Sequence, residues 1–293
     1  MNITIIGPGA IGVSLAISLA NNNTVSLLVK QQHNNLVKKG KISVKELSGK
    51  IIDKEIIITT KLSKPDLVIL AVKSYNVKNL LNELIRIDTP ILCCQNGLQT
   101  LNRLKKKINP NHMSYLVTGA GSSKIEAGVS HRNGEGFTFI GQIEGHNGLK
   151  IKNISDSLNT NGIECGSVEN IQDYIWLKAI INSAINPIAT INKVTNGDLR
   201  KKDLIRDVEK ICTESPAIAQ HVGINLPLNP WKEIVTILDK TSSNKCSMLQ
   251  DVENQQETEI EAINGEFVRI ALDNNLDATY NSLAVSKVKQ ITN

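Results

Sequence analysis

The sequence predicts an α/β protein, with a doubly wound parallel sheet in its N-terminal part and an all-helical C-terminal domain. Three observations support this fold class. Short apolar runs alternate with helical patterns through the first half, a glycine-rich loop separates the first strand from the first helix, and strand-like runs cease after Cys165. We therefore expect two domains, residues 1–165 and residues 166–293.

The first thirty residues predict a dinucleotide-binding unit of the Rossmann type. A β-rich apolar run, Asn2–Ile6, is followed by the loop Gly7-Pro8-Gly9-Ala10-Ile11-Gly12, a helical pattern through Leu19 and a second strand, Thr24–Val29. A GxGxxG loop between a strand and a helix is a specific signal, because its first glycine permits the tight turn, its second lets a pyrophosphate approach, and its third allows close packing. The phosphates would lie at the helix N-terminus.

The residue after the second strand bears on the choice of cofactor. An acidic residue at this place binds the ribose hydroxyls of NAD and repels a 2′-phosphate. Here the chain carries Lys30 and has no acid. We interpret Lys30 as a contact to the 2′-phosphate, which predicts NADPH/NADP as the cofactor. The alternative is a surface lysine that binds no ligand.

Further strands and helices continue this pattern toward Cys165. Residues just beyond the C-terminal ends of parallel strands line the ligand crevice of a doubly wound sheet, so Lys73 and Asn96 are expected to meet the cofactor. For Asn96, the alternative is the first residue of an Asn-Gly turn. The Gly- and Ser-rich segment before the last strand has no clear assignment. The predicted elements are strands at 66–72, 90–95, 114–118 and 136–140, and helices at 77–85 and 101–107.

The stretch Tyr174–Pro187 predicts an apolar helix that carries one polar stripe. Lys178, Asn182 and Asn186 recur at i, i+4 and i+8, so they share one side of the helix. The helix is expected to end or kink at Asn186, because the following proline disfavours the α conformation there. A partly desolvated lysine beside amides can donate a proton to a substrate oxygen. The alternative is a surface lysine with asparagines that serve as caps or loop contacts.

The remaining C-terminal sequence predicts helices separated by polar loops. Asn196 and Gly197 mark a turn, residues 204–221 form a long helix, and residues 241–243 form a loop. A last amphipathic helix is expected to begin at Glu257–Glu261. Taken alone, its acids are most simply a solvated face at the N-terminal end of that helix.

Composition excludes several classes of function. The chain has 293 residues, is 41% hydrophobic and 21% charged, and contains no apolar run long enough to span a bilayer and no signal-peptide pattern at its N-terminus. Its five cysteines form no CxxC pair and no metal-ligand spacing, so we expect free thiols, no metal and a cytoplasmic location. A net charge of +5 is too small and dispersed to predict nucleic-acid binding.

Taken together, the motifs resemble the ketopantoate reductase (2-dehydropantoate 2-reductase) family. They are GPGAIG at the start, QNG at residues 95–97, WLK-x3-N-x3-NP at residues 176–187, NG at residues 196–197, and SMLQD-x7-EIE-x2-NGE at residues 247–266. The resemblance covers nearly the whole chain in the right order. It implies a Rossmann domain, a helical domain and an active site in the cleft between them. The implied activity is reduction of 2-dehydropantoate to pantoate with NADPH, in pantothenate and coenzyme A biosynthesis.

The resemblance also implies roles for individual residues. Lys178 and Glu259 would be the catalytic residues. Lys178 would bind the substrate and donate the proton, and Glu259 would contact the cofactor near the nicotinamide and Lys178. Asn96 would bridge the nicotinamide ribose and the substrate. The other substrate contacts would be Asn182, Asn186, Asn196 and Ser247; the other cofactor contacts would be Gly7, Pro8, Gly9, Ala10, Ile11, Gly12, Lys30 and Lys73.

The chain departs from the family pattern at Cys246, where a serine is usual. This leaves open a contact with the substrate carboxylate. We consider two interpretations, a modifiable thiol in the substrate loop and a small buried residue without special reactivity.

Two other functions remain open at this point. One is a related dehydrogenase that acts on another 2-oxo or hydroxy acid. The other is a non-catalytic NADP(H)-binding regulator, although a pure sensor would need no proton donor such as Lys178. The expected partner is a small-molecule 2-oxo acid, with no nucleic acid and no membrane, and a homodimer is left open.

Overall fold

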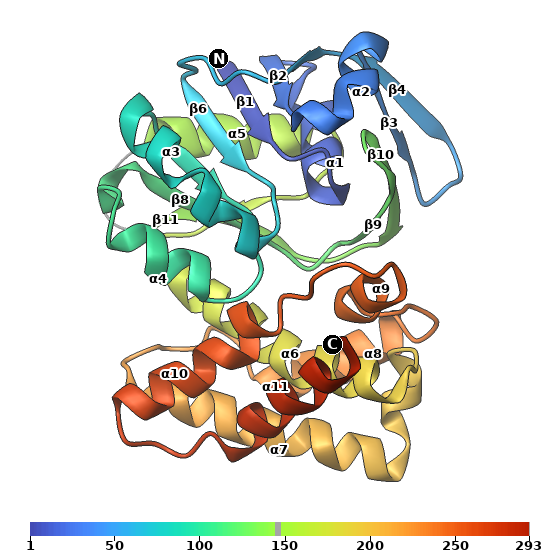
Figure 1. The fold of residues 1–293 in the computed structure, drawn as a ribbon, viewed down its shortest axis with the longest axis vertical. Helices are drawn as coiled ribbons and strands as arrows, with labels where there is room; N and C mark the ends of the chain where they lie inside the picture. The colour runs from blue at the N-terminus through green and yellow to red at the C-terminus, as the bar shows by residue number, and fades with distance from the viewer. Residues whose placement is uncertain (144–147, 293) are drawn as a thin grey trace. The chain divides into compact units, whose positions relative to one another are not determined.

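The structure is a computed structural model that describes residues 1–143 and 148–292 (Figure 1). The chain forms two compact units. The first contains Met1–Gln95 and Leu104–Ile171, and the second contains Asn96–Arg103 and the residues from Gln172 onward. The division at residues 165 and 166 stays a prediction. By packing, the short segment Asn96–Arg103 joins the helical unit although it follows a strand of the first.

The first unit is built on an eight-stranded, mainly parallel sheet, which confirms the predicted fold class. Its order is β12-β11-β8-β7-β6-β1-β2-β5, and among the described strands of this sheet the pair β8–β11 alone is antiparallel. The strand order therefore reverses between β1 and β6, the switch point at which ligands bind such sheets. The strands are β1 (Asn2–Ile6), β2 (Thr24–Leu28), β5 (Ile57–Thr59), β6 (Leu67–Leu70), β7 (Ile91–Cys93), β8 (Met113–Thr118), β11 (Thr138–Gln142) and β12 (Gly166–Ser167).

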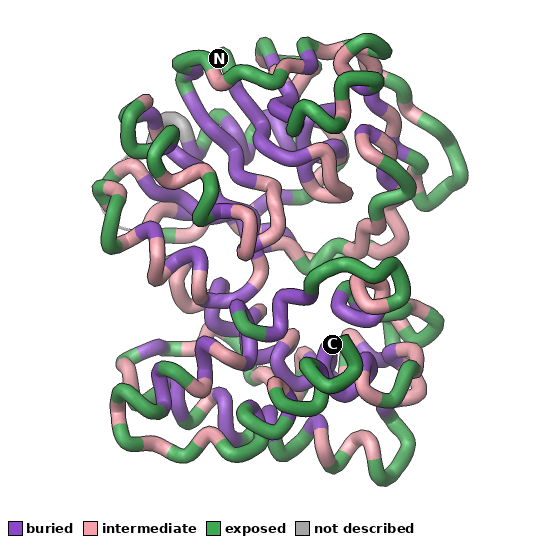
Figure 2. The backbone as a smooth tube through the Cα atoms, viewed as in Figure 1, coloured by how far each residue is buried: buried purple, intermediate pink, exposed green. Residues whose placement is uncertain are grey.

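The central strands are buried on both faces. All four residues of β6, and every residue of β1 after Asn2, are buried (Figure 2). Because successive side chains of a strand point to opposite faces, this pattern requires cover on each side of the sheet. The continuous apolar runs in the sequence are the cause.

Helices of both α and 3₁₀ type connect these strands. The predicted helix at 77–85 is in fact a 3₁₀ segment followed by a later α-helix, so this prediction was wrong in its start. The α-helices are α1 (Ala10–Leu19), α2 (Asn34–Lys39), α3 (Leu81–Ile87), α4 (Gln99–Lys105) and α5 (Gly148–Thr160); the 3₁₀ segments are η1 (Gln31–His33), η2 (Ser74–Asn79) and η3 (Pro110–His112).

A second, four-stranded sheet accounts for the segment that had no sequence assignment. Its order is β4-β3-β10-β9, formed by β4 (Ile51–Glu55), β3 (Lys41–Lys45), β10 (Val129–Gly134) and β9 (Gly121–Glu126). Arg132 of β10 donates to the hydroxyls of Ser14 and Ser18 on α1, each at 3.1 Å, and pairs with Glu46. The small sheet is thereby anchored on the first helix.

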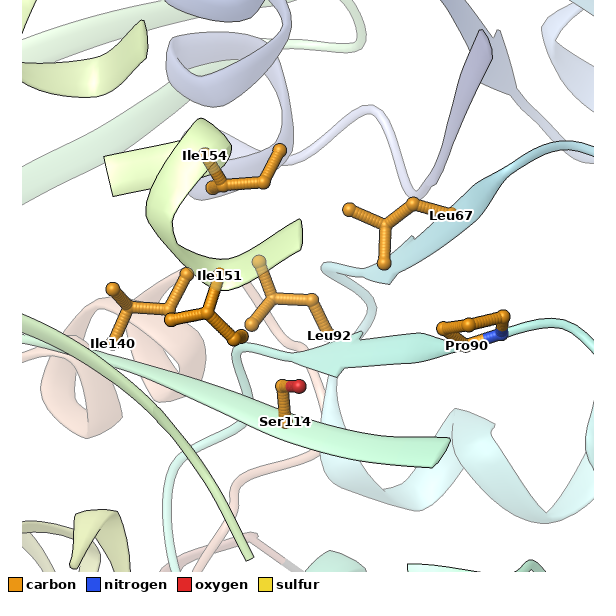
Figure 3. A pocket seen from close by; sticks show the side chains of 7 residues that line it. All are labelled: Leu67, Pro90, Leu92, Ser114, Ile140, Ile151 and Ile154. Atoms are coloured by element: carbon orange, nitrogen blue, oxygen red, sulfur yellow. The ribbon is translucent and has the colours of Figure 1, made fainter. Parts of the chain in front are cut away.

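One small apolar cavity lies in the core of the first unit (Figure 3). It is enclosed between α5 and strands β6, β7, β8 and β11, and the hydroxyl of Ser114 is the polar side-chain group that lines it. The lining residues are Leu67, Pro90, Leu92, Ser114, Ile140, Ile151 and Ile154. No residue predicted for the functional site is among them, so we regard this cavity as a packing feature.

The second unit is helical, as predicted. The expected helix beginning at Glu257 was wrong, because residues 256–260 are not helical, and a π-helical turn leads into two further helices. The strand pattern also extends slightly past Cys165, through the two residues of β12. The helical segments are α6 (Ile171–Asn192), η4 (Gly197–Arg200), α7 (Lys202–His221), α8 (Pro230–Lys240), α9 (Ser247–Glu253), the π-turn η5 (Glu261–Gly265), α10 (Glu266–Asp273) and α11 (Thr279–Thr292).

Helix α6 does not end at Asn186, so that part of the prediction was wrong, and the alternative of a kink there stays a prediction. The helix continues past Pro187 to Asn192. Proline has no N–H to donate to the carbonyl four residues earlier, that of Ser183. In this structure Nδ2 of Asn264 donates to that carbonyl at 2.9 Å, which offsets the lost helix hydrogen bond.

Candidate functional site

The glycine-rich loop lies at the switch point of the large sheet. Gly7 has a φ of +118°, and a Cβ there would lie 2.9 Å from the carbonyl oxygen of Ala71, just after β6. A Cβ on Gly12 would lie 2.1 Å from the carbonyl oxygen of Gly7. Larger residues are therefore excluded at both positions, as the predicted roles of these two glycines require.

The N-terminus of α1 fits a dinucleotide pyrophosphate. Its N-cap is Gly9, which has no side chain to cap the N–H groups of the first turn. A Cβ built on Gly9 would meet nothing closer than the carbonyl oxygen of Ala71 at 4.0 Å, so the space beside it is open. Uncapped N–H groups and the helix dipole favour an anion at this place.

The glycine loop is braced by the small sheet. The backbone N–H of Gly128, in the turn between β9 and β10, donates to the carbonyl of Pro8 at 3.3 Å. The segment that could not be assigned from the sequence therefore supports the loop that gave the clearest signal. No local feature of residues 121–134 predicts this contact.

The end of β2 is a region of positive charge. Lys30 is exposed, and its Nζ donates to Oδ1 of Asn76 at 3.2 Å. Partial burial lowers the pKa of nearby His33, and the positive charges of Lys124 and Lys30 lower it further. Such surroundings suit a phosphate, although the role of Lys30 stays a prediction.

Lys73 and Gln95 lie just beyond the C-terminal ends of β6 and β7. Lys73 is half-buried and stands directly before η2. Gln95, to which the sequence gave no role, donates its amide to the carbonyls of Leu70 at 2.7 Å and Val72 at 3.1 Å. Gln95 thus ties the end of β7 to the end of β6. Its place in the QNG motif was the available signal.

The residues predicted for substrate binding and catalysis all belong to the second unit. The glycine loop, Lys30 and Lys73, which were predicted to contact the cofactor, belong to the first unit. Lys178 and Asn182 are half-buried on α6, and Asn186 is 4% exposed. Because α6 is uninterrupted, the three side chains share one face of it, as their spacing predicted. The full set in this unit is Asn96, Lys178, Asn182, Asn186, Asn196, Ser247 and Glu259.

Asn96 and Glu259 are brought together from distant parts of the sequence. Nδ2 of Asn96 donates to Oε2 of Glu259 at 3.0 Å. Glu259 is only 5% exposed, so its interpretation as part of a solvated helical face was wrong, whereas Glu257 and Glu261 are exposed. The carboxylate therefore fixes which way the Asn96 amide faces.

Asn196 holds the loop that precedes α9. Its Nδ2 donates to Oγ1 of Thr241 at 2.8 Å, and its backbone N–H donates to the carbonyl of Asn244 at 2.9 Å. The side chain is buried, and Ser247, at the start of α9, is exposed. Asn196 therefore positions the segment that carries Ser247, and its own contact with a substrate stays a prediction.

Cys246 is a buried N-cap, not an accessible thiol. Its Sγ accepts from the backbone N–H of Leu249 at 3.4 Å and lies 3.6 Å from both the carbonyl oxygen of Asn186 and Oγ1 of Thr190. Burial raises the pKa of this thiol. The geometry favours the interpretation as a small buried residue, because its sulfur is used to tie α9 to α6.

Comparison with known proteins identifies the family of this chain. Residues 3–145 match the family model described as ketopantoate reductase PanE/ApbA, and residues 170–292 match the model of its C-terminal part. The chain belongs to the ketopantoate reductase family. This family of oxidoreductases includes the 2-dehydropantoate 2-reductases of Pyrococcus horikoshii and Pyrococcus abyssi. The first is 32% identical over 99% of this chain and 97% of the relative, and the second is 33% identical with the same coverage.

Solved structures show the same fold at lower identity. A D-mandelate dehydrogenase with NADH and anilino(oxo)acetate superimposes with a TM-score of 0.91 at 22% identity, over 100% of this chain and 98% of that one. A 2-dehydropantoate 2-reductase from Geobacter metallireducens gives a TM-score of 0.89 at 20% identity, over 99% of each chain. The family resemblance and the fold predicted from the sequence are thus confirmed.

The described residues contain neither a metal-binding group nor a membrane-spanning helix. Within 1–143 and 148–292, no group of histidine, cysteine and acidic side chains could hold a metal ion. Over the same residues, no helix is long and apolar enough to cross a membrane.

Proposed function

We propose that this member of the ketopantoate reductase family reduces 2-dehydropantoate to pantoate with NADPH, in pantothenate and coenzyme A biosynthesis. The observation that carries the proposal is the uninterrupted face of Lys178, Asn182 and Asn186 in the unit that also holds the Asn96–Glu259 pair. An apolar helix with one half-buried lysine in register with two amides suits a keto acid. A non-catalytic regulator would have no use for this arrangement.

The proposed roles follow from the charge that develops during reduction. A bound nicotinamide cofactor would supply the hydride. Negative charge then develops on the ketone oxygen of the substrate, where the Lys178 ammonium would stabilise it and donate the proton. This interaction is stronger in the transition state than in the ground state, so it raises turnover. Asn96 and Asn182 would orient the keto acid, and such positioning lowers the barrier.

The proposed cofactor is NADPH because of the basic end of β2. Lys30 stands where an acidic residue would favour NAD, and Lys124 adds a second positive charge near His33. The pyrophosphate would be held by the loop from Gly7 to Gly12, whose geometry fits it. We also propose that the enzyme is cytoplasmic, since all five cysteines are buried free thiols.

The deciding experiment is NADPH oxidation by the purified protein with 2-dehydropantoate, measured against a panel of other 2-oxo acids that includes an aryl 2-oxo acid. We expect kcat/KM to be largest for 2-dehydropantoate. A larger value for another acid would assign the chain to a related dehydrogenase. Binding of NADPH without turnover of any acid would support the regulator. Light scattering on the same sample decides whether the chain is a homodimer.

A further inference from the structure

Pro187 removes one backbone hydrogen bond from α6, beside the face that carries Lys178, Asn182 and Asn186. The carbonyl that would receive its N–H belongs to Ser183, which lies between Asn182 and Asn186. Ser183 is fully buried, so water cannot take the place of the missing donor. A buried carbonyl without a partner is costly, and a helix is prone to bend where such a bond is missing.

Asn264 supplies the missing donor from a distant part of the chain. Its Nδ2 donates to the Ser183 carbonyl and to Oδ1 of Asn281, each at 2.9 Å. Asn281 is held in turn by Glu214 at 2.8 Å and Ser215 at 3.0 Å. Asn264 and Asn281 are both 0% exposed. The Asn264 amide is therefore fixed in place by its neighbours.

The same π-turn that carries Asn264 also holds the segment around Asn96. The carbonyl of Ala262 accepts the backbone N–H of Leu98 at 3.0 Å. A Cβ on Gly97 would lie 2.2 Å from that carbonyl oxygen, so only glycine allows this approach. Glu259, the partner of Asn96, lies just before the turn. One turn of chain thus contacts the backbone next to both groups of proposed substrate-binding residues, at Ser183 and at Leu98.

We propose that Asn264 is a positioning residue, which replaces the hydrogen bond that Pro187 cannot make and thereby fixes the Lys178–Asn182–Asn186 face relative to the Asn96–Glu259 pair. Asn264 touches no reacting atom. Without its amide, α6 is free to bend between Asn182 and Asn186, which moves one end of the polar stripe against the other. The predicted effect on turnover rests on the proposed function, whereas the effect on α6 does not.

The test is a set of four proteins: wild type, Asn264→Ala, Pro187→Ala and the double variant. Hydrogen exchange of the backbone amides at residues 188–192 reports opening of α6 beyond the proline. We expect Asn264→Ala to speed this exchange about tenfold, the scale of one buried hydrogen bond. Pro187→Ala should restore slow exchange in the double variant, because alanine at position 187 has the N–H that proline lacks.

Asn281→Ala is the matched control. This asparagine is equally buried and belongs to the same network, but it does not contact the Ser183 carbonyl. Its substitution should destabilise the protein without rescue by Pro187→Ala. Equal rescue of Asn264→Ala and Asn281→Ala, or no rescue of Asn264→Ala, would overturn the proposal. If Asn264→Ala is insoluble, recovery of folded double variant counts as rescue, and its failure to fold counts against the proposal.

Steady-state kinetics with 2-dehydropantoate give the second measurement. Asn264→Ala should lower kcat about tenfold, leave the KM for NADPH unchanged and regain activity in the double variant. A loss of stability at unchanged kcat would reduce Asn264 to a structural residue. If wild type does not turn over 2-dehydropantoate, the proposed function fails, and the exchange measurement still decides whether Asn264 holds α6.

Discussion

The two units of the molecule specify their functional groups in different ways. In the first, the glycine loop is shaped by backbone contacts close to β1 and β6, and its key residues lie within six positions of one another. In the second, side chains are held by partners far away in the sequence: Asn264 is 81 residues from Ser183, and Glu259 is 163 residues from Asn96. Contacts within the glycine loop therefore leave a local signature in the sequence, whereas hydrogen bonds between side chains and partners distant in the sequence do not.

The largest effect is expected from Lys178→Ala. This variant tests whether the proton donor of the reaction belongs to the second unit. Turnover should fall by roughly two to four orders of magnitude, the scale of losing a positioned acid. The KM for NADPH should change little, because the cofactor loop belongs to the first unit. Exposed Lys232 on α8 provides the control Lys232→Ala. Near-normal turnover of Lys178→Ala would remove this lysine from the mechanism.

Glu214→Ala tests the buried network that supports the second unit. The Glu214 carboxylate accepts three hydrogen bonds at 2.8 Å, from the backbone N–H groups of Tyr280 and Asn281 and from the Asn281 amide. Leaving these donors unpaired should lower the free energy of unfolding by about 3 kcal/mol. Urea unfolding measures this loss, with exposed Glu209→Ala on the same helix as the control. A loss no larger than that of the control contradicts the role of the network.

Lys30→Glu tests the one place where a side chain of the first unit is proposed to set specificity. Wild type should prefer NADPH over NADH roughly five- to thirtyfold, because a 2′-phosphate carries nearly two negative charges. The substitution should weaken NADPH and leave NADH much less affected. The measurement is kcat/KM for both cofactors at low and high salt, since screening reduces the preference.

Exposed Lys38→Glu controls for the change in net charge. A wild type that prefers NADH, or a Lys30→Glu variant that weakens both cofactors equally, would leave Lys30 as a surface charge. The assignment of NADP would then fail with it.

The smallest effect concerns one buried cysteine in each unit. Burial raises the pKa of Cys165 in the first unit, and of Cys212 in the second, from 9.0 to about 11. Well below pH 9 both thiols are neutral in the folded and unfolded chain, so their contribution to stability is complete. Between about pH 9 and about pH 11 the unfolded chain loses these protons first, and this contribution is lost.

Urea unfolding at about pH 8 and about pH 10.5 measures this dependence. Cys165→Ala and Cys212→Ala should each make the decline with pH shallower, while ionisation of lysine and tyrosine remains common to all samples. Equal declines in wild type and both variants would show that burial of these thiols has no linkage to stability. Unequal effects of the two substitutions would show which unit limits stability at high pH.

Much of the first unit was predictable because its signals are local. The strand Asn2–Ile6 was predicted with its observed bounds, and the spacing of the glycine loop follows from contacts within it. The face of Lys178, Asn182 and Asn186 was predictable for the same reason, since helical spacing is local. The continuation of α6 past Pro187 was not predictable, because the donor to the Ser183 carbonyl is Asn264, which lies 81 residues later in the chain.

The buried position of Glu259 was also beyond local inference. Its sequence neighbours Glu257 and Glu261 are exposed, and the alternation of acids resembles a solvated face. The hydrogen bond from Asn96, 163 residues earlier in the chain, distinguishes it. The four-stranded sheet was missed for a related reason: its parallel pair joins β3 to β10, which are more than eighty residues apart.

The segment Asn96–Arg103 has a consequence for the order in which the protein is made. Its residues Leu98 and Leu101 are buried, and the segment belongs to a unit whose remaining residues begin at Gln172. During synthesis this segment leaves the ribosome well before its partners exist, so it waits with apolar side chains uncovered while the N-terminal sheet forms. A chain that begins at residue 166 also lacks the Leu98 N–H, which donates to the Ala262 carbonyl. The second unit is therefore not a contiguous genetic module that can be excised or transplanted, even though it is compact in space.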